Sequence, residues 1–233
     1  MARLGEAVMR ISIIIPTLNE SAIIARALTA VRKGRDIEII VADGGSVDGT
    51  VKLARSFRVR TVVSGPGRAR QMNAGAEVSE GDALLFLHAD TLLPDGYDGH
   101  IRRALARPGA VAGAFSLSID SSAAGLRLIE RLANWRSRVL GLPYGDQAVF
   151  VKTDAFRAVG GFPDMPIMED FELMRRLKGA GKIEIVPLPA VTSARRWERT
   201  GVLKMTLINQ AVIAAYYMGV PPEKIVRWAR KGY

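Results

Sequence analysis

Cysteine is absent from this 233-residue sequence, and aromatic residues are scarce at 6%. The lack of cysteine excludes a disulfide framework and thiolate chemistry. Arginine and lysine residues are scattered rather than interleaved with aromatics, so neither base-stacking platforms nor nucleic-acid binding is expected. No apolar h-region precedes Ile11, so we expect no signal peptide. The sequence therefore indicates a cytoplasmic protein, with the inner face of the membrane as the alternative location.

Two common phosphate-binding motifs are also missing. The Gly44-Gly45 pair is not part of a G-x-G-x-x-G fingerprint, and no G-x-x-x-x-G-K-S/T segment occurs. Their absence weakens an NAD-type or a P-loop interpretation. The formal net charge of +10 admits three explanations, which are a phosphorylated substrate, an anionic membrane and a plainly basic surface.

Hydrophobic residues make up 48% of the chain, which is enough for a sizeable core. In the first half, apolar runs that end at turn residues alternate with stretches of helical spacing. This alternation predicts a parallel sheet with right-handed crossovers. Asn19 and Asp48 are expected to cap the first two helices. We expect strands over Ile11–Ile15, Ile37–Ala42, Val59–Val63 and Ala83–Leu87, and helices over Ile23–Val31, Gly49–Phe57 and Arg70–Ala76.

The second half is less regular. The segment from Val202 to Val220 is mostly apolar but contains Lys204, Asn209 and Gln210. Since a spanning helix needs about 20 predominantly apolar residues, we expect a core or interfacial helix here. The other expected elements are strands over Ala110–Ile119, Ala148–Val151 and Ile183–Val186, helices over Gly125–Leu140 and Phe171–Leu177, and a final basic helix from Pro221.

Polar residues that follow two of the predicted strands are the first candidates for chemistry. His88 and Asp90 come directly after the apolar run Leu84–Leu87, and Asp43 ends an earlier strand. Ligands of parallel sheets bind beyond the carboxyl ends of the strands, and residues two apart in a strand point to the same side. We therefore expect His88 and Asp90 on one side, with Asp90 able to hold a divalent metal against a diphosphate. The alternatives are turn residues for both aspartates and a polar strand end for His88.

Other charged residues admit two interpretations each. Glu169 and Asp170 precede a predicted helix, so they are either N-terminal capping residues or the source of a general base that deprotonates a hydroxyl. Guanidinium groups present a planar fork to phosphate oxygens. Four arginines are therefore either solvated surface or donors to a diphosphate: Arg68, Arg70, Arg195 and Arg196.

Taken together, five segments resemble family 2 glycosyltransferases with the GT-A fold, in the family's order. They are Ile13–Glu20, Val41–Thr50, Gly67–Gly75, Phe86–Asp90 and Met168–Leu173. The segments Gly145–Phe150 and Ser193–Trp197 further resemble a small bacterial subgroup. The resemblance implies an α/β chain whose mostly parallel sheet is flanked by helices. It also implies one GT-A domain over residues 1–200, with a donor-binding half at 11–90 and an acceptor-side half at 91–200, and a helical C-terminal extension at 201–233.

The activity that the resemblance implies is transfer of a sugar from a nucleotide diphosphate donor, usually a UDP-sugar, to a hydroxyl acceptor with inversion. Asp90 matches the last residue of the family's D-x-D motif, which binds Mn²⁺ or Mg²⁺, although His88 replaces the first Asp. Asp170 or Glu169 matches the acidic pair that supplies the base. Two residues of the segment that resembles the subgroup are either structural or face the acceptor, a small molecule or a lipid: Asp146 and Gln147. The positions implied in donor binding are Pro16, Thr17, Glu20, Asp43, Gly44, Arg70, Asn73, His88, Ala89, Arg195 and Arg196.

Two other functions stay open as alternatives. A nucleotidyltransferase acting on a sugar phosphate would also use strand-end carboxylates and a metal, but it calls for a basic Gly-rich loop after the first strand, which the sequence lacks. A non-catalytic, membrane-associated binding module would use the helix between Arg127 and Arg138 and the apolar helix from Val202. Donor binding and turnover distinguish the three functions.

Overall fold

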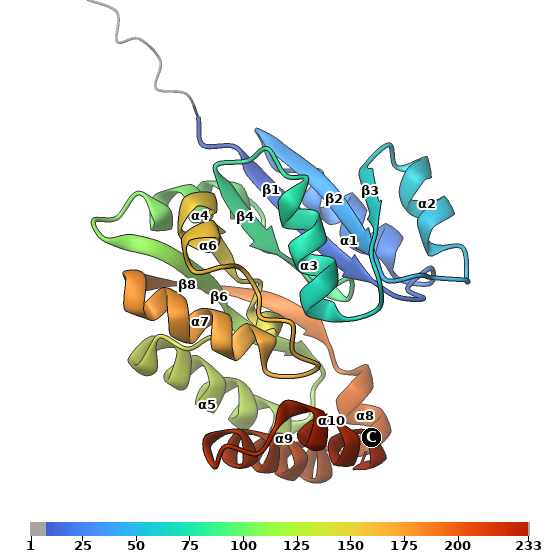
Figure 1. Ribbon diagram of the computed structural model, residues 1–233, viewed down its shortest axis with the longest axis vertical. Helices are drawn as coiled ribbons and strands as arrows, with labels where there is room; N and C mark the ends of the chain where they lie inside the picture. Colours follow the sequence, from blue (N-terminus) through green and yellow to red (C-terminus); the bar gives the residue numbers. More distant parts are fainter. Residues whose placement is uncertain (1–7, 233) are drawn as a thin grey trace, which may run out of the picture.

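Strands and helices alternate in the first half of the computed structural model, as the sequence predicts (Figure 1). The structure describes residues 8–232. The expectation that no signal peptide precedes Ile11 therefore falls mostly outside the described residues. The elements of this half are β1 Ile11–Thr17, α1 Ile24–Val31, β2 Ile37–Asp43, α2 Thr50–Ser56, β3 Arg60–Val63, α3 Arg68–Glu77 and β4 Ala83–Phe86.

The second half contains every element expected from the sequence and several short ones that were not predicted. The unpredicted elements are β5 Thr91–Leu92, α4 Tyr97–Leu105, the 3₁₀ helix η1 Gly145–Gln147, α6 Thr153–Ala158 and α8 Arg195–Thr200. The expected ones are β6 Ala110–Asp120, α5 Ala124–Leu140, β7 Phe150–Lys152, α7 Glu169–Ala180, β8 Lys182–Ser193, α9 Val202–Tyr217 and α10 Pro222–Gly232.

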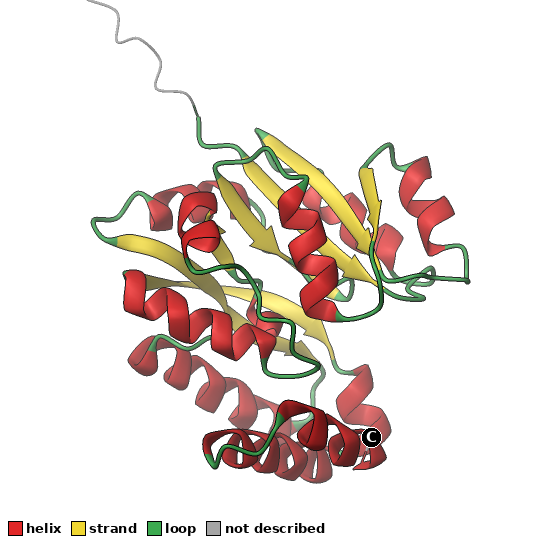
Figure 2. Ribbon diagram, viewed as in Figure 1, coloured by secondary structure: helices red, strands yellow, loops and turns green. Residues whose placement is uncertain are grey.

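The strands form one mostly parallel sheet in the order β3-β2-β1-β4-β7-β6-β8-β5. β1 pairs in parallel with β2 and β4, β2 with β3, and β6 with β8. β7 is antiparallel to both of its neighbours, and β5 is antiparallel to β8. The strands (yellow in Figure 2) lie between helices, which confirms the predicted sheet flanked by helices.

Both faces of the sheet are buried against helices. Successive side chains of a strand point to opposite faces, so neighbouring residues of β1 pack in different clusters. Ile13 of β1 packs in one cluster with Leu28 of α1 and Ile101 of α4. The next residue, Ile14, packs in the other cluster with Met72 of α3. The continuous isoleucine run in β1 is therefore the pattern of a central strand covered on both sides.

Three corrections concern helix and strand ends. Asp48 is not the N-cap of α2, which is Gly49, although the Asp48 carboxylate accepts from the Thr50 amide over 3.0 Å. Asn19 does not cap α1, whose N-cap position is Ile23. Instead, the amide of Val47 donates to Asn19 Oδ1 over 3.0 Å, so Asn19 holds the loop after β2. The last predicted strand stops at Val186 before two prolines, whereas β8 continues to Ser193. A register shift against β6 lies at these prolines, and a bulge is a position where a strand tolerates proline.

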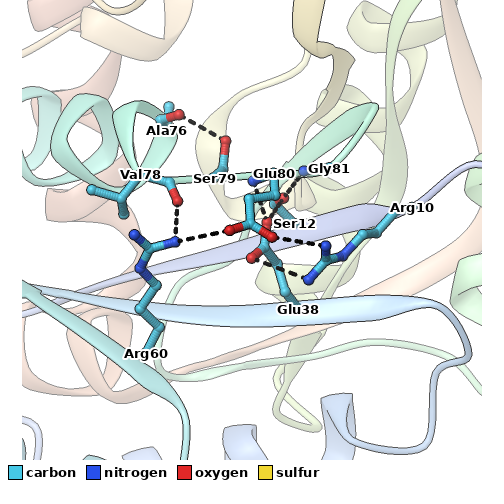
Figure 3. A network of polar contacts seen from close by, with 9 residues as sticks. All are labelled: Arg10, Ser12, Glu38, Arg60, Ala76, Val78, Ser79, Glu80 and Gly81. Atoms are coloured by element: carbon cyan, nitrogen blue, oxygen red, sulfur yellow. Dashed lines mark hydrogen bonds and ion pairs between the residues drawn. The ribbon is translucent and has the colours of Figure 1, made fainter.

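A polar network fastens the end of the sheet where the parallel strands begin (Figure 3). Ser12 of β1 and the amide of Glu80 both donate to Glu38 of β2, the latter over 2.6 Å. Arg10 lies 3.6 Å from Glu38 and 2.9 Å from Glu80. This network ties the amino ends of β1 and β2 to the turn before β4. It thereby helps to fix the register of these strands, whose carboxyl ends carry the candidate site.

The C-terminal helices pack on the start of α7. The ring of Phe171 lies 5.6 Å from that of Tyr216 and 5.7 Å from that of Tyr217, and Tyr216 Oη donates to Glu172 over 3.0 Å. The division into residues 1–200 and 201–233 stays a prediction. Within the described part of the chain, no helix has both the length and the apolar character that a bilayer crossing requires.

Candidate active site

The carboxyl ends of β1 and β2 bring Thr17 and Asp43 together as register partners. Asp43 is buried, and its carboxylate accepts hydrogen bonds from the amides of Gly45 and Ser46 at 2.8 and 2.7 Å. The hydroxyls of Ser46 and Thr17 donate to the other oxygen. Burial opposes ionisation of Asp43, but these hydrogen bonds outweigh it and hold the pKa below its usual value.

These four donors match the roughly four lone-pair sites of a carboxylate. Asp43 therefore organises its own loop, as the turn interpretation expects, and a nucleoside would have to displace a donor such as the Ser46 hydroxyl to reach it. The role of Asp43 in donor binding stays a prediction.

Gln71 of α3 fixes the ends of β1 and β2 beside the same loop. Sequence reasoning assigned this residue no role. Its buried amide nitrogen donates to the carbonyls of Thr17 at 2.7 Å and of Ala42 at 3.0 Å. A Cβ on Gly44 would lie 3.0 Å from the Gln71 amide carbon, so Gly44 allows this close approach. Pro16 lies in β1 beside Ala42.

Arg70 and Asn73 of α3 hold the segment that precedes α7. Arg70 forms an exposed, two-pronged ion pair with Asp164, with its Nε and Nη2 both 2.9 Å from the carboxylate oxygens. Asn73 donates to the Phe162 carbonyl at 2.8 Å and accepts from the Phe162 amide at 3.0 Å. Donor contacts of these two residues stay predictions, and the structure shows them fastening the loop at residues 162–164.

The structure contradicts the expectation that His88 and Asp90 share one side. β4 ends at Phe86, and a turn follows, so the strand geometry does not persist over these residues. His88 lines a small pocket with Asp170. Asp90 instead lines a separate cavity of about 330 Å³, which it shares with Ala89 and Arg195.

The small pocket lies between the end of β4 and the start of α7. It measures about 10 Å³ and is lined by His88, Arg68, Gly145 and Asp170 among apolar side chains, so it has room for about one water molecule. Burial, followed by the charges of Arg68 and Arg196, lowers the pKa of His88 to about 3. His88 is therefore a neutral imidazole at physiological pH.

Gly145 separates His88 from Asp170. Its amide donates to Asp170 Oδ2 over 2.7 Å. A Cβ at this position would lie 3.2 Å from both Asp170 Oδ2 and His88 Nε2. Glycine is therefore the residue that lets the carboxylate and the imidazole approach the same point, and sequence reasoning assigned it no role.

Glu169 and Asp170 are the first two residues of α7, two positions earlier than predicted, and neither caps it because the N-cap is Met168 in a left-handed conformation at φ 68°. Glu169 is 4% exposed and lies 3.4 Å from Arg68 Nη1. Burial and then the charge of Asp170 raise the pKa of Glu169, while Arg68 opposes the shift. Of the acidic pair, Asp170 lines the small pocket and Glu169 is held beneath it by an ion pair.

A second cluster of charged side chains contains Asp90, Glu20 and Arg195. Arg195 Nη2 lies 3.6 Å from Asp90 Oδ2 and 4.0 Å from Glu20 Oε2. Burial raises the pKa of Glu20, the charges of Asp90 and Asp48 act in the same direction, and Arg195 opposes them. The extension of β8 beyond its prolines brings Arg195 to this place, over a hundred residues after Asp90.

Asp146 and Gln147 lie in η1. Gln147 is buried, and its amide accepts from Ser137 of α5 at 2.7 Å and donates to the Phe115 carbonyl at 3.0 Å. Burial and then the charge of Asp170 raise the pKa of Asp146 to about 6, against the charges of nearby arginines. Gln147 braces the loop, and the contacts of both residues with an acceptor stay predictions.

Comparison with known proteins decides the family. A family model for "Glycosyl transferase family 2" matches residues 12–159, more than half of the chain. The chain belongs to glycosyl transferase family 2.

Two curated relatives of this family 2 chain are named as biosynthetic proteins. The PGL/p-HBAD biosynthesis glycosyltransferase of Mycobacterium tuberculosis is 36% identical over 91 residues, which are 35% of this chain and 36% of the relative. Succinoglycan biosynthesis protein ExoA of Rhizobium meliloti is 27% identical over 197 residues, 72% of this chain and 58% of ExoA.

Solved structures of S. aureus TarS share the fold. TarS 1–349 superposes with a TM-score of 0.65 at 16% identity, over 84% of this chain and 64% of the TarS 1–349 chain. Its complex with UDP-GlcNAc gives a TM-score of 0.63 at 16% identity, over 79% and 58% of the two chains. The family 2 chain thus has the GT-A-type fold that its motifs implied, and it spans between 36% and 64% of the length of these proteins.

The residues around Asp90 fit a metal that shares its coordination with a substrate. Among residues 8–232, no cluster of three or more acidic or histidine side chains is arranged to hold a metal ion. The Asp90 side chain is 32% exposed and lines the larger cavity, so its carboxylate is accessible to a ligand there. Mg²⁺ is often bound by one or two carboxylates together with phosphate oxygens and water, and this donor set suits such an ion rather than an all-protein cage.

Proposed function

We propose that this chain is an inverting glycosyltransferase that moves a sugar from a nucleotide diphosphate sugar, a UDP-sugar, to the hydroxyl of an acceptor. The observation that carries the proposal is the small pocket in which Asp170 of α7 meets His88 from the end of β4. There a carboxylate from the acceptor-side half faces the sheet edge where donors bind in parallel α/β folds. Membership of family 2 supports the reaction class.

Three cationic side chains close to these groups support the binding of a diphosphate. Arg195 lies beside Asp90 and Glu20, Arg68 lines the pocket with Asp170, and the charge of Arg196 acts on His88 and Asp146. A departing diphosphate gains negative charge, and fixed positive groups stabilise it as the bond breaks. Thr17, Glu20 and Asp43 are proposed to hold the nucleoside.

In the proposed step, the acceptor oxygen attacks the anomeric carbon from the face opposite the diphosphate. The bond between this carbon and the phosphate oxygen breaks, and its electron pair leaves with the nucleoside diphosphate. Asp170 accepts the proton of the attacking hydroxyl. A positioned general base contributes about 10²- to 10⁴-fold to such a rate, and inversion requires no covalent enzyme intermediate.

Asp90 is the residue proposed to hold Mn²⁺ or Mg²⁺. When bound there, such an ion would supply positive charge to the diphosphate oxygens. Arg195 already lies within 3.6 Å of the Asp90 carboxylate, so the guanidinium contributes charge of the same sign at this place.

The proposal is tested by a thermal-shift screen of nucleotide sugars with and without Mn²⁺, followed by assay of nucleotide release. UDP-GlcNAc, with which a TarS structure is in complex, is the first donor to try. Binding to the native state should raise the apparent melting temperature, and NMR of the product should show inversion. If no nucleotide sugar binds, and none is hydrolysed or transferred, the proposal fails.

Asp90→Ala tests the metal part of the proposal separately. Metal-dependent UDP binding should weaken in this variant, because one carboxylate and the diphosphate would share the ion. Unchanged affinity in the presence of Mn²⁺ would reject Asp90 as the metal ligand.

A further inference from the structure

Helix α5 carries an apolar stripe that faces solvent. Leu128, Leu132, Trp135 and Val139 are 58–60% exposed. Their spacing of four, three and four residues places them on one side of the helix, along about 17 Å of its length at 1.5 Å per residue. The opposite side of α5 is buried against the protein, so this stripe is not the core-facing side of the helix.

The charge next to this stripe is positive. Arg131 and Arg138 of α5 are exposed. The single acidic residue in the sequence of α5, Glu130, is buried and lies 2.8 Å from Arg127. The solvent side of α5 therefore combines apolar side chains with guanidinium groups and no acidic side chain of its own helix.

The start of α9 packs beside α5 and carries exposed leucines of its own. Val202 packs in one cluster with Leu126 and Ile129 of α5, and both helices lie at the end of the molecule remote from β3 (Figure 1). Leu203 and Leu207, one turn apart on α9, are exposed. We call the exposed residues of α5 named above, together with Leu203, Lys204 and Leu207, the α5–α9 face.

We propose that the α5–α9 face docks on an anionic lipid surface. A stripe of leucine and tryptophan bordered by arginine is the composition of helices that lie in the membrane interface, where tryptophan and arginine place an apolar part in lipid and a polar part in the headgroups. A second copy of the chain would bring like charges together across the contact, which opposes self-association. An anionic bilayer instead complements both the apolar stripe and the arginines.

Docking through α5 would hold the candidate active site close to the lipid. Ser137 of α5 donates to Gln147, and Arg136 lies over the Tyr144 ring, 3.5 Å from its centroid. These contacts keep the loop that carries Gly145 against the inner side of α5. That loop would then lie about one helix diameter, roughly 10 Å, from the docked stripe.

Flotation of the full chain with vesicles tests the proposal without donor or acceptor, so its outcome is independent of the proposed catalysis. The chain should float with phosphatidylcholine vesicles that contain phosphatidylglycerol and not with pure phosphatidylcholine vesicles. Replacing Arg131→Gln and Arg138→Gln together should weaken binding about 30-fold, since each basic residue near an anionic surface contributes about a factor of five. Replacing Leu132→Ser and Trp135→Ser should weaken it at least about tenfold.

The matched control removes two positive charges elsewhere. Lys52 and Arg55 are exposed on α2, and the double variant Lys52→Gln with Arg55→Gln should bind vesicles as the parent does. Melting temperatures of all variants should equal that of the parent, because the altered side chains are exposed. Equal loss in the α2 control would assign binding to net charge and overturn the proposal. So would absence of binding, or a dimer in sedimentation velocity that Leu132→Ser with Trp135→Ser dissociates.

Discussion

Gly145→Ala is the smallest change that perturbs the pocket between Asp170 and His88. The added methyl carbon would lie 3.2 Å from both Asp170 Oδ2 and His88 Nε2, closer than an ordinary contact of 3.4–4 Å. The backbone of Gly145 does not have a positive φ, so alanine introduces no backbone strain of that kind. The neighbours must give way by a few tenths of an ångström, and the 2.7 Å hydrogen bond from the Gly145 amide to Asp170 is the contact that loses its geometry.

The magnitude follows from the size of that shift. A misplacement of 1 Å in a catalytic group costs about 10²-fold in rate, so a shift of about 0.3 Å corresponds to about a fourfold loss of kcat. The cost in stability should not exceed about 1–3 kcal/mol, the range for an added methyl group in a packed site. The loss should fall mainly on kcat, because the methyl group approaches the proposed base and not the Asp43 loop; any change in the donor KM, through its contact with His88, should be smaller than the change in kcat.

Release of UDP from a UDP-sugar, with water or a hydroxyl compound as acceptor, measures this effect. The matched control is Gly179→Ala in the same helix as Asp170, where a Cβ meets nothing within 4 Å. This control should keep the parent kcat and gain up to about 1 kcal/mol of stability, because alanine is the better helix former. An unchanged kcat in Gly145→Ala, or a loss confined to KM, would refute the assignment of the pocket to catalysis.

Three further changes test other parts of the account. Burial raises the pKa of Asp146 to about 6, so the native parent binds this proton more tightly than the unfolded chain does, and the parent loses stability as pH rises through 4 to 6. Asp146→Asn removes this titrating group, so the variant should gain up to about 3 kcal/mol more stability over the parent at pH 8 than at pH 3. Urea unfolding at the two pH values measures this difference, and a parallel pH dependence of parent and variant would contradict it. Gln71→Ala removes two hydrogen bonds to buried strand carbonyls and should lower the free energy of unfolding in urea by about 1–3 kcal/mol. An unaltered urea midpoint would show that the amide does not stabilise the loop. Gly113→Ala would place a Cβ 2.3 Å from the Glu184 carbonyl oxygen and should lower the free energy of unfolding by at least about 3 kcal/mol; a melting temperature equal to the parent's would argue against the close packing of β6 on β8.

Much of the fold follows from the sequence because periodic apolar runs determine it. The run Ile11–Ile15 predicts a strand buried on both faces, and the side chains of β1 lie in the two clusters that cover the two faces of the sheet. The same reasoning stops at prolines, so it misses the extension of β8 to Ser193, which depends on a register shift against β6. Short elements such as α8 lack enough turns to show a period.

The site was less predictable because its contacts join distant parts of the chain. The sequence marks Arg70 and Asn73 as polar residues on a helix, but their partners Asp164 and Phe162 lie about ninety residues later. His88 and Asp90 were expected on one side because a strand was assumed to continue, and a turn separates them instead. Gly145 carries no chemical signal in the sequence, since its importance comes from the space that it leaves between two other residues.

Turnover by Asp170→Asn, measured together with donor binding, tests the central claim most directly. The amide cannot accept the proton of the attacking hydroxyl, so nucleotide release should fall by about 10²-fold or more, while the dissociation constant for the donor stays that of the parent. Glu169→Gln provides the comparison, because Glu169 is held by Arg68 and does not line the pocket. Turnover in Asp170→Asn within a few-fold of the parent would contradict the assignment of Asp170 as the base.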